Sequence, residues 1–284
     1  MRKINTLIIA FLITINFIAQ NKPAYKLYNA NGHKVSYKHM VKKLSKANIV
    51  LFGEYHDNPI IHWLQYEITV DLNKLKNLTL GAEMFEADNQ IPLNKYLLDS
   101  INQKGLDTLL RLWRNYKTDY KPLVDFAKKN KLNFSATNVP RRYARKVYKD
   151  GFEILNKLSD SEKSWIAPLP IKYDATLSGY MKFKEMLGSH ATDNSPKAQA
   201  LKDATMAYFI LKNRENSKLF IHYNGSYHSD NFEGIYWYLK KEKPQLNIKT
   251  ISVVEQQKVK KFNKENKNLA NFIIVVDESM TKTY

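Results

Sequence analysis

The chain has 284 residues, enough for one sizeable domain with an attached subdomain. Its 44% hydrophobic and 25% charged residues are typical of a globular protein and exclude a disordered or collagen-like one. Lys and Arg number 45 against 27 Asp and Glu, a net charge of +18, which suits an anionic ligand or an anionic membrane surface. The lysines are spread along the chain, without a zinc finger, RNA-binding signature or basic zipper, so we do not expect nucleic acid as a partner.

The N-terminal residues have the layout of a secretory signal peptide. Residues 1–3 (MRK) carry positive charge, residues 7–19 are almost wholly apolar, and a polar stretch begins at Gln20. We predict a signal peptide over residues 1–19, with an uncleaved anchor as the alternative, and a mature domain over residues 20–284. The protein is then exported to the periplasm or cell envelope. Because the chain has no Cys, we expect no disulfides and no lipoprotein anchor on an N-terminal Cys.

Buried strands and helices alternate along the rest of the chain. Residues 62–75 carry apolar side chains at helical spacing, and residues 141–215 are mostly helical with no strong strand candidate. Apolar runs that predict strands lie at 47–52, 78–85, 131–137, 218–224, 248–254 and 271–276. This order predicts an α/β fold with a mainly parallel sheet and an inserted helical subdomain at about 141–215.

Polar side chains stand at the ends of three predicted strands. Glu54 and His56 follow the first strand, Glu83 lies near the end of the second, and His228 follows the fourth. Ligands of open α/β sheets gather beyond the carboxyl ends of the strands, so we expect these side chains to share one crevice. They could bind a divalent metal that activates water, or act as a general base with an orienting partner. The alternative is that each one only caps a turn or a helix.

Other polar residues leave two interpretations open. His62 lies at the start of a helix and either faces solvent or joins the site, whereas His222 lies within a strand, where a hydrogen-bonded core histidine is expected. Arg141 and Arg142 follow the 131–137 strand at a helix start. There they either bind a carboxylate or phosphate of a ligand or are simply solvated.

The helix before the fourth strand carries Gln199 and Asp203 four residues apart, and therefore on one face. We expect a solvated polar stripe there rather than part of a site. The aromatic residues Trp113, Tyr116 and Tyr120 are expected in the core rather than around a ligand.

Five polar segments follow one another in a fixed order: Gly53-Glu54-Tyr55-His56-Asp57 with His62 and Gln65; Glu83-Met84-Phe85-Glu86 with Gln90; Asn138-Val139-Pro140-Arg141; Gln199, Asp203 and Met206-Ala207; and Gly225-Ser226-Tyr227-His228. Together they resemble the ChaN family of haem-binding, iron-regulated proteins, within the group that includes Tiki proteases and erythromycin esterases. The resemblance extends from about residue 45 to the last predicted strand near 276. It implies an α/β/α sheet with a helical subdomain, and a role in haem or iron uptake at the cell envelope alongside other uptake components.

The resemblance also implies haem iron bound by a tyrosine, and two haems paired across a homodimer. A phenolate is a hard anionic donor that favours ferric iron. We expect Tyr143 to be this ligand, ahead of Tyr148 and Tyr180, with Arg141 and Arg142 pairing with the haem propionates. Many ChaN relatives are lipoproteins, so the absence of Cys means that anchoring differs here or is lacking.

The Tiki proteases and erythromycin esterases suggest a second hypothesis, a metal-dependent or His-based hydrolase. In it Glu54, His56, Glu83 and His228 are metal ligands or acid–base residues, and Tyr227 steadies the developing oxyanion. Haem binding alone gives no reason for this Glu and His set. Haem or another small-molecule ligand nevertheless remains the expected partner, and haem binding the expected main role.

Overall fold

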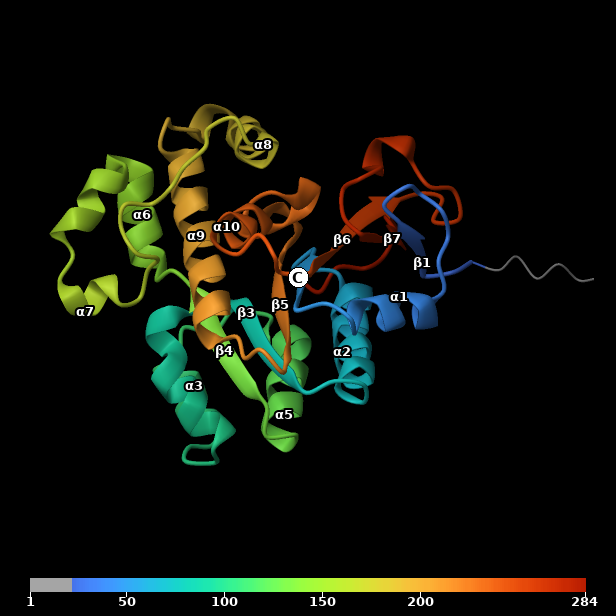
Figure 1. The fold of residues 1–284 in the computed structure, drawn as a ribbon, viewed down its shortest axis with the longest axis horizontal. Helices are drawn as coiled ribbons and strands as arrows, with labels where there is room; N and C mark the ends of the chain where they lie inside the picture. Colours follow the sequence, from blue (N-terminus) through green and yellow to red (C-terminus); the bar gives the residue numbers. More distant parts are fainter. Residues whose placement is uncertain (1–21) are drawn as a thin grey trace, which may run out of the picture.

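The structure is a computed structural model that describes residues 22–284. It contains a seven-stranded sheet with the strand order β1-β7-β6-β2-β5-β3-β4 (Figure 1). Strands β2 to β7 are parallel, and β1 runs antiparallel to β7 at one edge. The strands are β1 (Tyr25–Asn29), β2 (Ile49–Glu54), β3 (Leu78–Glu86), β4 (Asn133–Asn138), β5 (Leu219–Gly225), β6 (Ile248–Gln256) and β7 (Phe272–Asp277).

The six predicted strands are present as β2 to β7, each within two residues of its predicted ends, and the predicted α/β fold with a mainly parallel sheet is confirmed. Strand β1 was not predicted, because its sequence YKLYN is short and largely polar. It pairs with the last strand, with Tyr25 opposite Val276. The predicted signal peptide, residues 1–19, lies outside the described residues.

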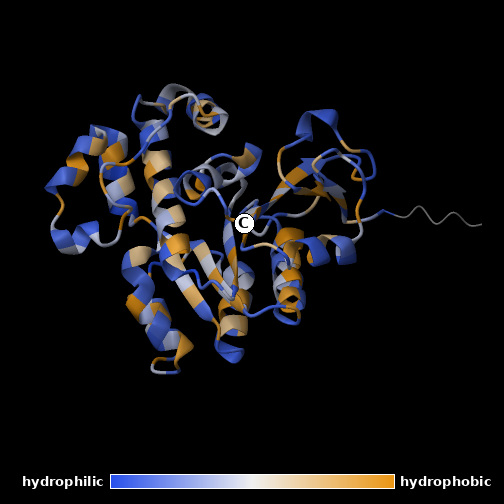
Figure 2. Cartoon of the chain, in the orientation of Figure 1, coloured by the Kyte–Doolittle hydropathy of each residue, from blue (hydrophilic) through white to orange (hydrophobic). Residues whose placement is uncertain are grey.

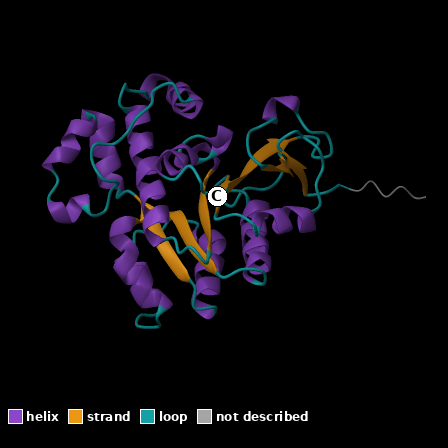
Figure 3. Cartoon of the chain, viewed as in Figure 1, coloured by secondary structure: helices purple, strands orange, loops and turns teal. Residues whose placement is uncertain are grey.

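Helices cover both faces of the sheet (Figure 3). In β2, Val50 and Phe52 pack into the core on one face, and Ile49 and Leu51 pack into the core on the other, because successive side chains of a strand point to opposite faces. A strand buried on both faces needs a continuous apolar sequence, which is why these strands could be predicted. Figure 2 shows helices with hydrophobic and hydrophilic bands, as expected of elements that cover a sheet.

The helices form the two outer layers. Residues of α1, α2, α3 and α5 share one core cluster, and residues of α6, α9 and α10 share the other. Their bounds are α1 (Tyr37–Leu44), α2 (Pro59–Asn73), α3 (Gln90–Leu97), α4 (Gln103–Leu109), α5 (Lys121–Lys129), α6 (Arg141–Asp150), α7 (Asp160–Lys163), α8 (Ser178–Leu187), α9 (Ser195–Asn213) and α10 (Ile235–Glu242). A π-helical turn, η2 (Tyr116–Tyr120), precedes α5, and a short 3-10 helix, η5 (Ser226–His228), follows β5.

Residues 141–215, all of them described, hold α6 to α9 and no strand, as predicted. Helix α9 begins at Ser195 with Pro196 in its first turn, where a missing N–H costs nothing. It lies between β4, α6 and α10, so most of its circumference is buried. Within residues 22–284 no helix combines the length and the apolar content that a membrane span requires.

Strand β4 forms the other edge of the sheet, and the side chain of Gln90 binds its outer backbone. Gln90 Nε2 donates to the carbonyl of Phe134 at 3.0 Å, and the N–H of Ala136 donates to Gln90 Oε1 at 2.6 Å. The amide therefore mimics one residue of an additional strand. Gln90, one of the residues that carried the family resemblance, serves the sheet edge through these contacts.

Candidate functional site

The carboxyl ends of β2, β5 and β3 are adjacent because these strands are neighbours in the sheet. Glu54 ends β2, Glu83 lies in β3, and His228 ends the 3-10 helix that follows β5. The N–H of Gly225 donates to Glu83 Oε2 at 2.8 Å, and a Cβ placed on Gly225 would lie 2.9 Å from His56 Nε2. The structure thus brings the four predicted side chains together around the glycine that ends β5.

His228 lies between two buried carboxylates. Its Nε2 is 3.1 Å from Glu83 Oε1, and its Nδ1 is 2.5 Å from Asp203 Oδ1. Asp203 comes from α9, and its Oδ2 accepts a hydrogen bond from the Tyr180 hydroxyl at 2.9 Å. One turn earlier on α9, Gln199 places its Nε2 3.2 Å from His228 Nδ1. All five side chains are buried, so these contacts are shielded from water.

These contacts set the protonation states. Burial lowers the pKa of His228, but Glu83 and Asp203 outweigh burial and raise the pKa to about 9. Burial raises the pKa of Glu83, yet the positive charge and hydrogen bond of His228 bring that pKa well below its ordinary value. For Asp203 burial dominates, and the pKa is raised. At neutral pH His228 is therefore an imidazolium beside an ionised Glu83, and both of its nitrogens are donors.

A second group of hydrogen bonds surrounds Glu54. His56 Nδ1 lies 2.7 Å from Glu54 Oε1, and the Tyr120 hydroxyl donates to the same oxygen at 2.7 Å. Gln65 Nε2 donates to Glu54 Oε2, and His62 Nδ1 lies 3.1 Å from Gln65 Oε1, which orients the amide. Tyr120 is carried by the π-helical turn, a distortion often found at functional sites.

His56 connects this group to the open surface. A third of its side chain, 33%, is exposed, against 5% for His228. Burial lowers the pKa of His56, but its hydrogen bond and charge interaction with Glu54 outweigh burial, and the pKa is raised. Trp113 packs edge-on against the ring, with the centroids 4.8 Å apart. With Nδ1 held by Glu54, the Nε2 of His56 is the imidazole nitrogen that faces Gly225 and the space next to Glu83.

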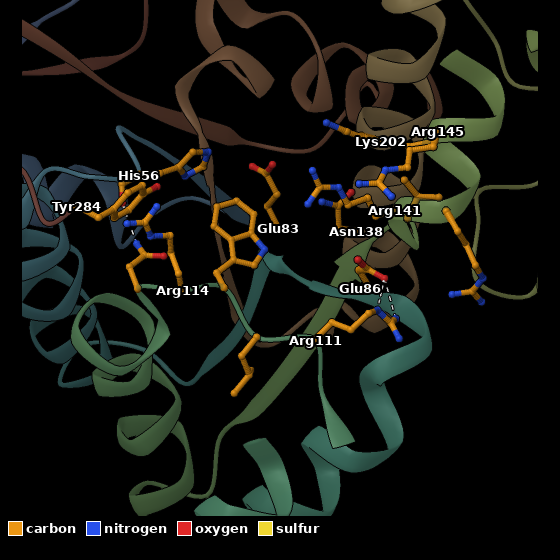
Figure 4. Close-up of a pocket in the computed structure, with 16 residues that line it drawn as sticks. His56, Glu83, Glu86, Arg111, Arg114, Asn138, Arg141, Arg145, Lys202 and Tyr284 are labelled. Carbon is orange, nitrogen blue, oxygen red and sulfur yellow. Dashed lines mark hydrogen bonds and ion pairs between the residues drawn. The ribbon is translucent and has the colours of Figure 1, made fainter. Parts of the chain in front are cut away.

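A cavity of about 1020 Å³ opens beside these residues (Figure 4). In Figure 4 Glu83 lies between His56 on one side and Arg141 and Lys202 on the other. The cations of the lining are Arg111, Arg114, Arg141, Arg142, Arg145 and Lys202, against the carboxylates of Glu83 and Glu86. A wall of this kind attracts anionic ligands, and guanidinium groups bind carboxylates and phosphates in a bidentate manner.

The cations of the cavity differ in whether a carboxylate already neutralises them. Arg111 pairs with Glu86 and Asp88, and Arg142 pairs with Asp88. The guanidinium of Arg114 lies 4.5 Å from the centroid of the Tyr284 ring. Among residues 22–284, no carboxylate lies within 4.0 Å of the charged nitrogens of the other cations, which leaves four of them open to a ligand: Arg114, Arg141, Arg145 and Lys202.

None of the three tyrosines considered as haem-iron ligands lines this cavity. Tyr143 is fully buried, with its hydroxyl accepting from Arg142 at 2.9 Å and donating to Glu162 at 3.0 Å. The hydroxyl of Tyr180 is bound to Asp203, and that of Tyr148 to the backbone of the 188–190 segment. The role of Tyr143 stays a prediction, and it requires the phenol to leave both partners. Tyr284, which the sequence gave no reason to select, is the tyrosine of the lining and is 49% exposed.

Two expectations for the histidines are now resolved. His62 does not face solvent, because only 6% of it is exposed and its ring contacts Gln65 and the carbonyl of His56. His222 is a hydrogen-bonded core residue, as predicted, with its Nε2 2.8 Å from Thr137 Oγ1. Burial lowers the pKa of His222 to about 4, so this ring is neutral.

The expectation that Gln199 and Asp203 form a solvated stripe was wrong. Both are buried and both contact His228. Their spacing showed that they share a face of α9, but not that this face points to the sheet edge. Of the aromatic residues expected in the core, Tyr116 and Tyr120 are buried, whereas Trp113 lines the cavity.

The four residues assigned to a metal site face one another in pairs, His228 with Glu83 and His56 with Glu54. In the part of the chain that the structure describes, no three His, Asp or Glu side chains are grouped so as to hold a metal ion. The metal role of these residues stays a prediction. In each pair an imidazole nitrogen lies within hydrogen-bond distance of a carboxylate oxygen.

Fold and site together define an α/β protein with a candidate ligand site at the carboxyl edge of its mainly parallel sheet. The chain belongs to the family described as "Haem-binding uptake, Tiki superfamily, ChaN", whose profile matches residues 40–239. The family resemblance drawn from the sequence is thereby confirmed. The matched residues include every member of the Glu and His groups, but not Tyr284 of the cavity wall.

Solved structures share this fold. ChaN of Campylobacter jejuni, a structure described as showing cofacial haem binding, has a TM-score of 0.66 at 19% identity, over 89% of this chain and 97% of that one. A Bacillus cereus protein has a TM-score of 0.51 at 10% identity, over 89% of this chain and 95% of that one.

A relative was also found by sequence. The chloroplast protein RETICULATA-RELATED 5 of Arabidopsis thaliana is 28% identical over an alignment of 139 residues that covers 46% of this chain. That match covers 18% of the plant protein, so the chain spans less than a fifth of its length.

Proposed function

We propose that the protein binds haem in the cation-lined cavity and serves haem or iron uptake at the cell envelope. The observation that carries the proposal is the set of four cations without carboxylate partners in a cavity of about 1020 Å³. That volume is at the upper end of the range of ligand pockets, about 300–1,000 Å³. Haem presents two propionates, so Arg141, Arg145 and Lys202 would bind the anionic edge of the ligand. When bound, haem would supply the iron, with a tyrosine as the donor suited to its ferric state.

The wider role of the protein rests on its relatives and on its first residues. The Campylobacter jejuni ChaN structure, described as binding haem cofacially, supports a haem-bridged homodimer here. The apolar run at residues 7–19 supports export to the periplasm or envelope, where other uptake components would be partners.

Titration of the purified full-length chain with hemin, followed by its absorbance spectrum, tests the proposal. The double variant Arg141→Glu, Arg145→Glu is expected to bind hemin at least about tenfold more weakly, because it removes two open cations and adds two charges that repel the propionates. Lys146→Glu with Lys149→Glu is the matched control, since both lysines are exposed on the same helix and do not line the cavity. Equal weakening in both variants would show that only net charge matters, and the proposed cavity would be rejected.

The same spectra identify the iron ligand. Tyr284 lines the cavity, whereas Tyr143 must break two hydrogen bonds to reach an iron atom. A tyrosinate spectrum that is lost in Tyr284→Phe and kept in Tyr143→Phe would assign the iron to the cavity wall. The opposite result would support the original prediction for Tyr143.

The exposed imidazole of His56, held by Glu54 beside Glu83, favours a second candidate function, hydrolysis of an anionic ester or peptide. Its raised pKa makes His56 a proton donor to a leaving group, and the cavity cations would orient the substrate. We expect any such activity to fall about 100-fold or more in His56→Ala and to persist in His33→Ala, a histidine that is exposed and does not line the cavity. Assays with a chelator and with added divalent metal separate a His-based reaction from a metal-dependent one. Cleavage that survives in His56→Ala would reject this candidate.

A further inference from the structure

The connection between β6 and β7 carries a concentration of positive charge, and none of its residues lines the cavity. Between residues 257 and 271 the single acidic residue is Glu265. Five lysines of this segment are exposed, and in the described part of the chain none of them forms an ion pair. We call them the lysine surface: Lys258, Lys260, Lys261, Lys264 and Lys267.

The backbone of this connection is held in place by a buried side chain. Gln256 is only 4% exposed, and its Nε2 donates to the carbonyls of Lys261 at 2.8 Å and Lys258 at 3.3 Å. Its Oε1 accepts from the N–H of Asn263 and the side chain of Asn266, both at 3.2 Å. The lysine surface therefore stands on a fixed loop rather than on a loose tail.

Apolar side chains of the same loop point inward. The Tyr28 hydroxyl donates to the carbonyl of Val259 at 2.7 Å, and the rings of Tyr28 and Phe262 are 4.9 Å apart. Gly32, at φ +79°, allows Phe262 to approach, since a Cβ there would lie 2.5 Å from its ring. No aromatic ring of the connection is left exposed for stacking on nucleic-acid bases.

The lysine surface lies at the end of the molecule where the described chain begins. Figure 1 places β1, β6 and β7 together, at the opposite end from α3, α6 and α7. The N–H of Asn268 donates to the carbonyl of Ala30 at 2.8 Å, which ties the connection to the turn after β1. The sequence that precedes β1 contains the apolar run at 7–19. The lysine surface is thus on the same side of the molecule as the first described residues.

We propose that the lysine surface docks the protein on a membrane leaflet that contains anionic lipid headgroups. Clustered lysines are attracted by the negative potential of such a leaflet, and the attraction falls off within a Debye length. The fixed loop and the inward apolar side chains, which leave no exposed aromatic ring of the connection for stacking on bases, favour lipid over nucleic acid. The charge of the lysine surface is the same whether or not the apolar run is cleaved off. The membrane proposal is also independent of the haem proposal.

Cosedimentation of the full-length chain with vesicles tests this surface. Vesicles that contain phosphatidylglycerol are compared with vesicles of pure phosphatidylcholine, at low and high salt. We expect binding to the anionic vesicles that salt weakens, and a loss of about tenfold or more in the triple variant Lys258→Glu, Lys260→Glu, Lys261→Glu. Binding to phosphatidylcholine measures the contribution of the apolar run, which is the same in every variant.

The matched control is the triple variant Lys95→Glu, Lys104→Glu, Lys129→Glu, whose lysines are exposed on α3, α4 and α5, outside the β6–β7 connection. It makes the same change in net charge and is expected to keep most of the binding. Equal losses in the two triple variants would overturn the proposal, as would equal binding to both kinds of vesicle. Tighter binding to duplex DNA than to the anionic vesicles would also overturn it.

Discussion

Replacing His228 with alanine is expected to lower the free energy of unfolding by about 3–5 kcal/mol. The variant leaves Glu83 and Asp203 buried without the cation that now lies between them. Urea unfolding followed by circular dichroism measures the loss. Tyr227→Ala is the control, because Tyr227 is the adjacent residue but is 47% exposed, so its replacement should change stability by no more than about 0.5 kcal/mol. A loss below about 1 kcal/mol for His228→Ala would contradict the role of the imidazolium.

The pH dependence of stability checks the same contact. The pKa of His228 is about 9 in the folded protein and about 6.5 when unfolded. Its stabilisation, on the order of 3 kcal/mol, is therefore complete below pH 6.5 and is lost as the pH rises through 9. We expect the wild type to lose stability across this interval and His228→Gln to lack that part of the fall. The contribution of Glu83 has the opposite pH dependence. Its lowered pKa stabilises the folded protein at neutral pH, and this stabilisation is lost as the pH falls into the acid range.

Gly225→Ala is expected to destabilise the protein by about 1–3 kcal/mol and to displace His56. The new Cβ would lie 2.9 Å from His56 Nε2 and 3.0 Å from its Cε1, so the ring must move away from Glu54 or the strand must shift. Thermal unfolding gives the stability change, and the imidazole resonances of His56 report the displacement.

A double-mutant cycle separates this clash from a general effect on β5. If the Cβ acts through the ring of His56, then Gly225→Ala should cost much less in a His56→Ala background. Simple additivity of the two changes would show that the glycine serves the backbone of the strand and not the site.

The strands, and the edge of the sheet at which their polar residues come together, could be predicted because both follow from local sequence patterns. The central strands, such as β2 and β3, are buried along their length and are largely apolar runs. Glu54, Glu83 and His228 lie at or near the carboxyl ends of β2, β3 and β5. In parallel sheets, ligands bind beyond these ends of the strands. Strand β1 escaped prediction because antiparallel pairing at an edge tolerates a short, polar sequence.

The remaining parts of the site depend on tertiary contacts. The orientation of α9 decides that Asp203 faces His228, and the helices packed around α9 set that orientation. The four open cations of the cavity come from three parts of the chain: Arg114 precedes the π-helical turn, Arg141 and Arg145 lie on α6, and Lys202 lies on α9. Arg141 could be selected from the sequence because it begins a helix directly after a strand, but no local pattern distinguishes Arg114, Arg145 and Lys202 from the many solvated cations in a chain with a net charge of +18.

The amide of Gln90 has a consequence for how two copies of this protein can associate. An incoming strand at β4 would need the same Phe134 carbonyl and Ala136 N–H that the amide already occupies. The central part of that edge is thus closed to continuous cross-molecule sheet formation, the usual route to β-aggregates. A homodimer that keeps Gln90 in place cannot join its sheets through this part of β4, and has to meet through the β1 edge, loops or helices.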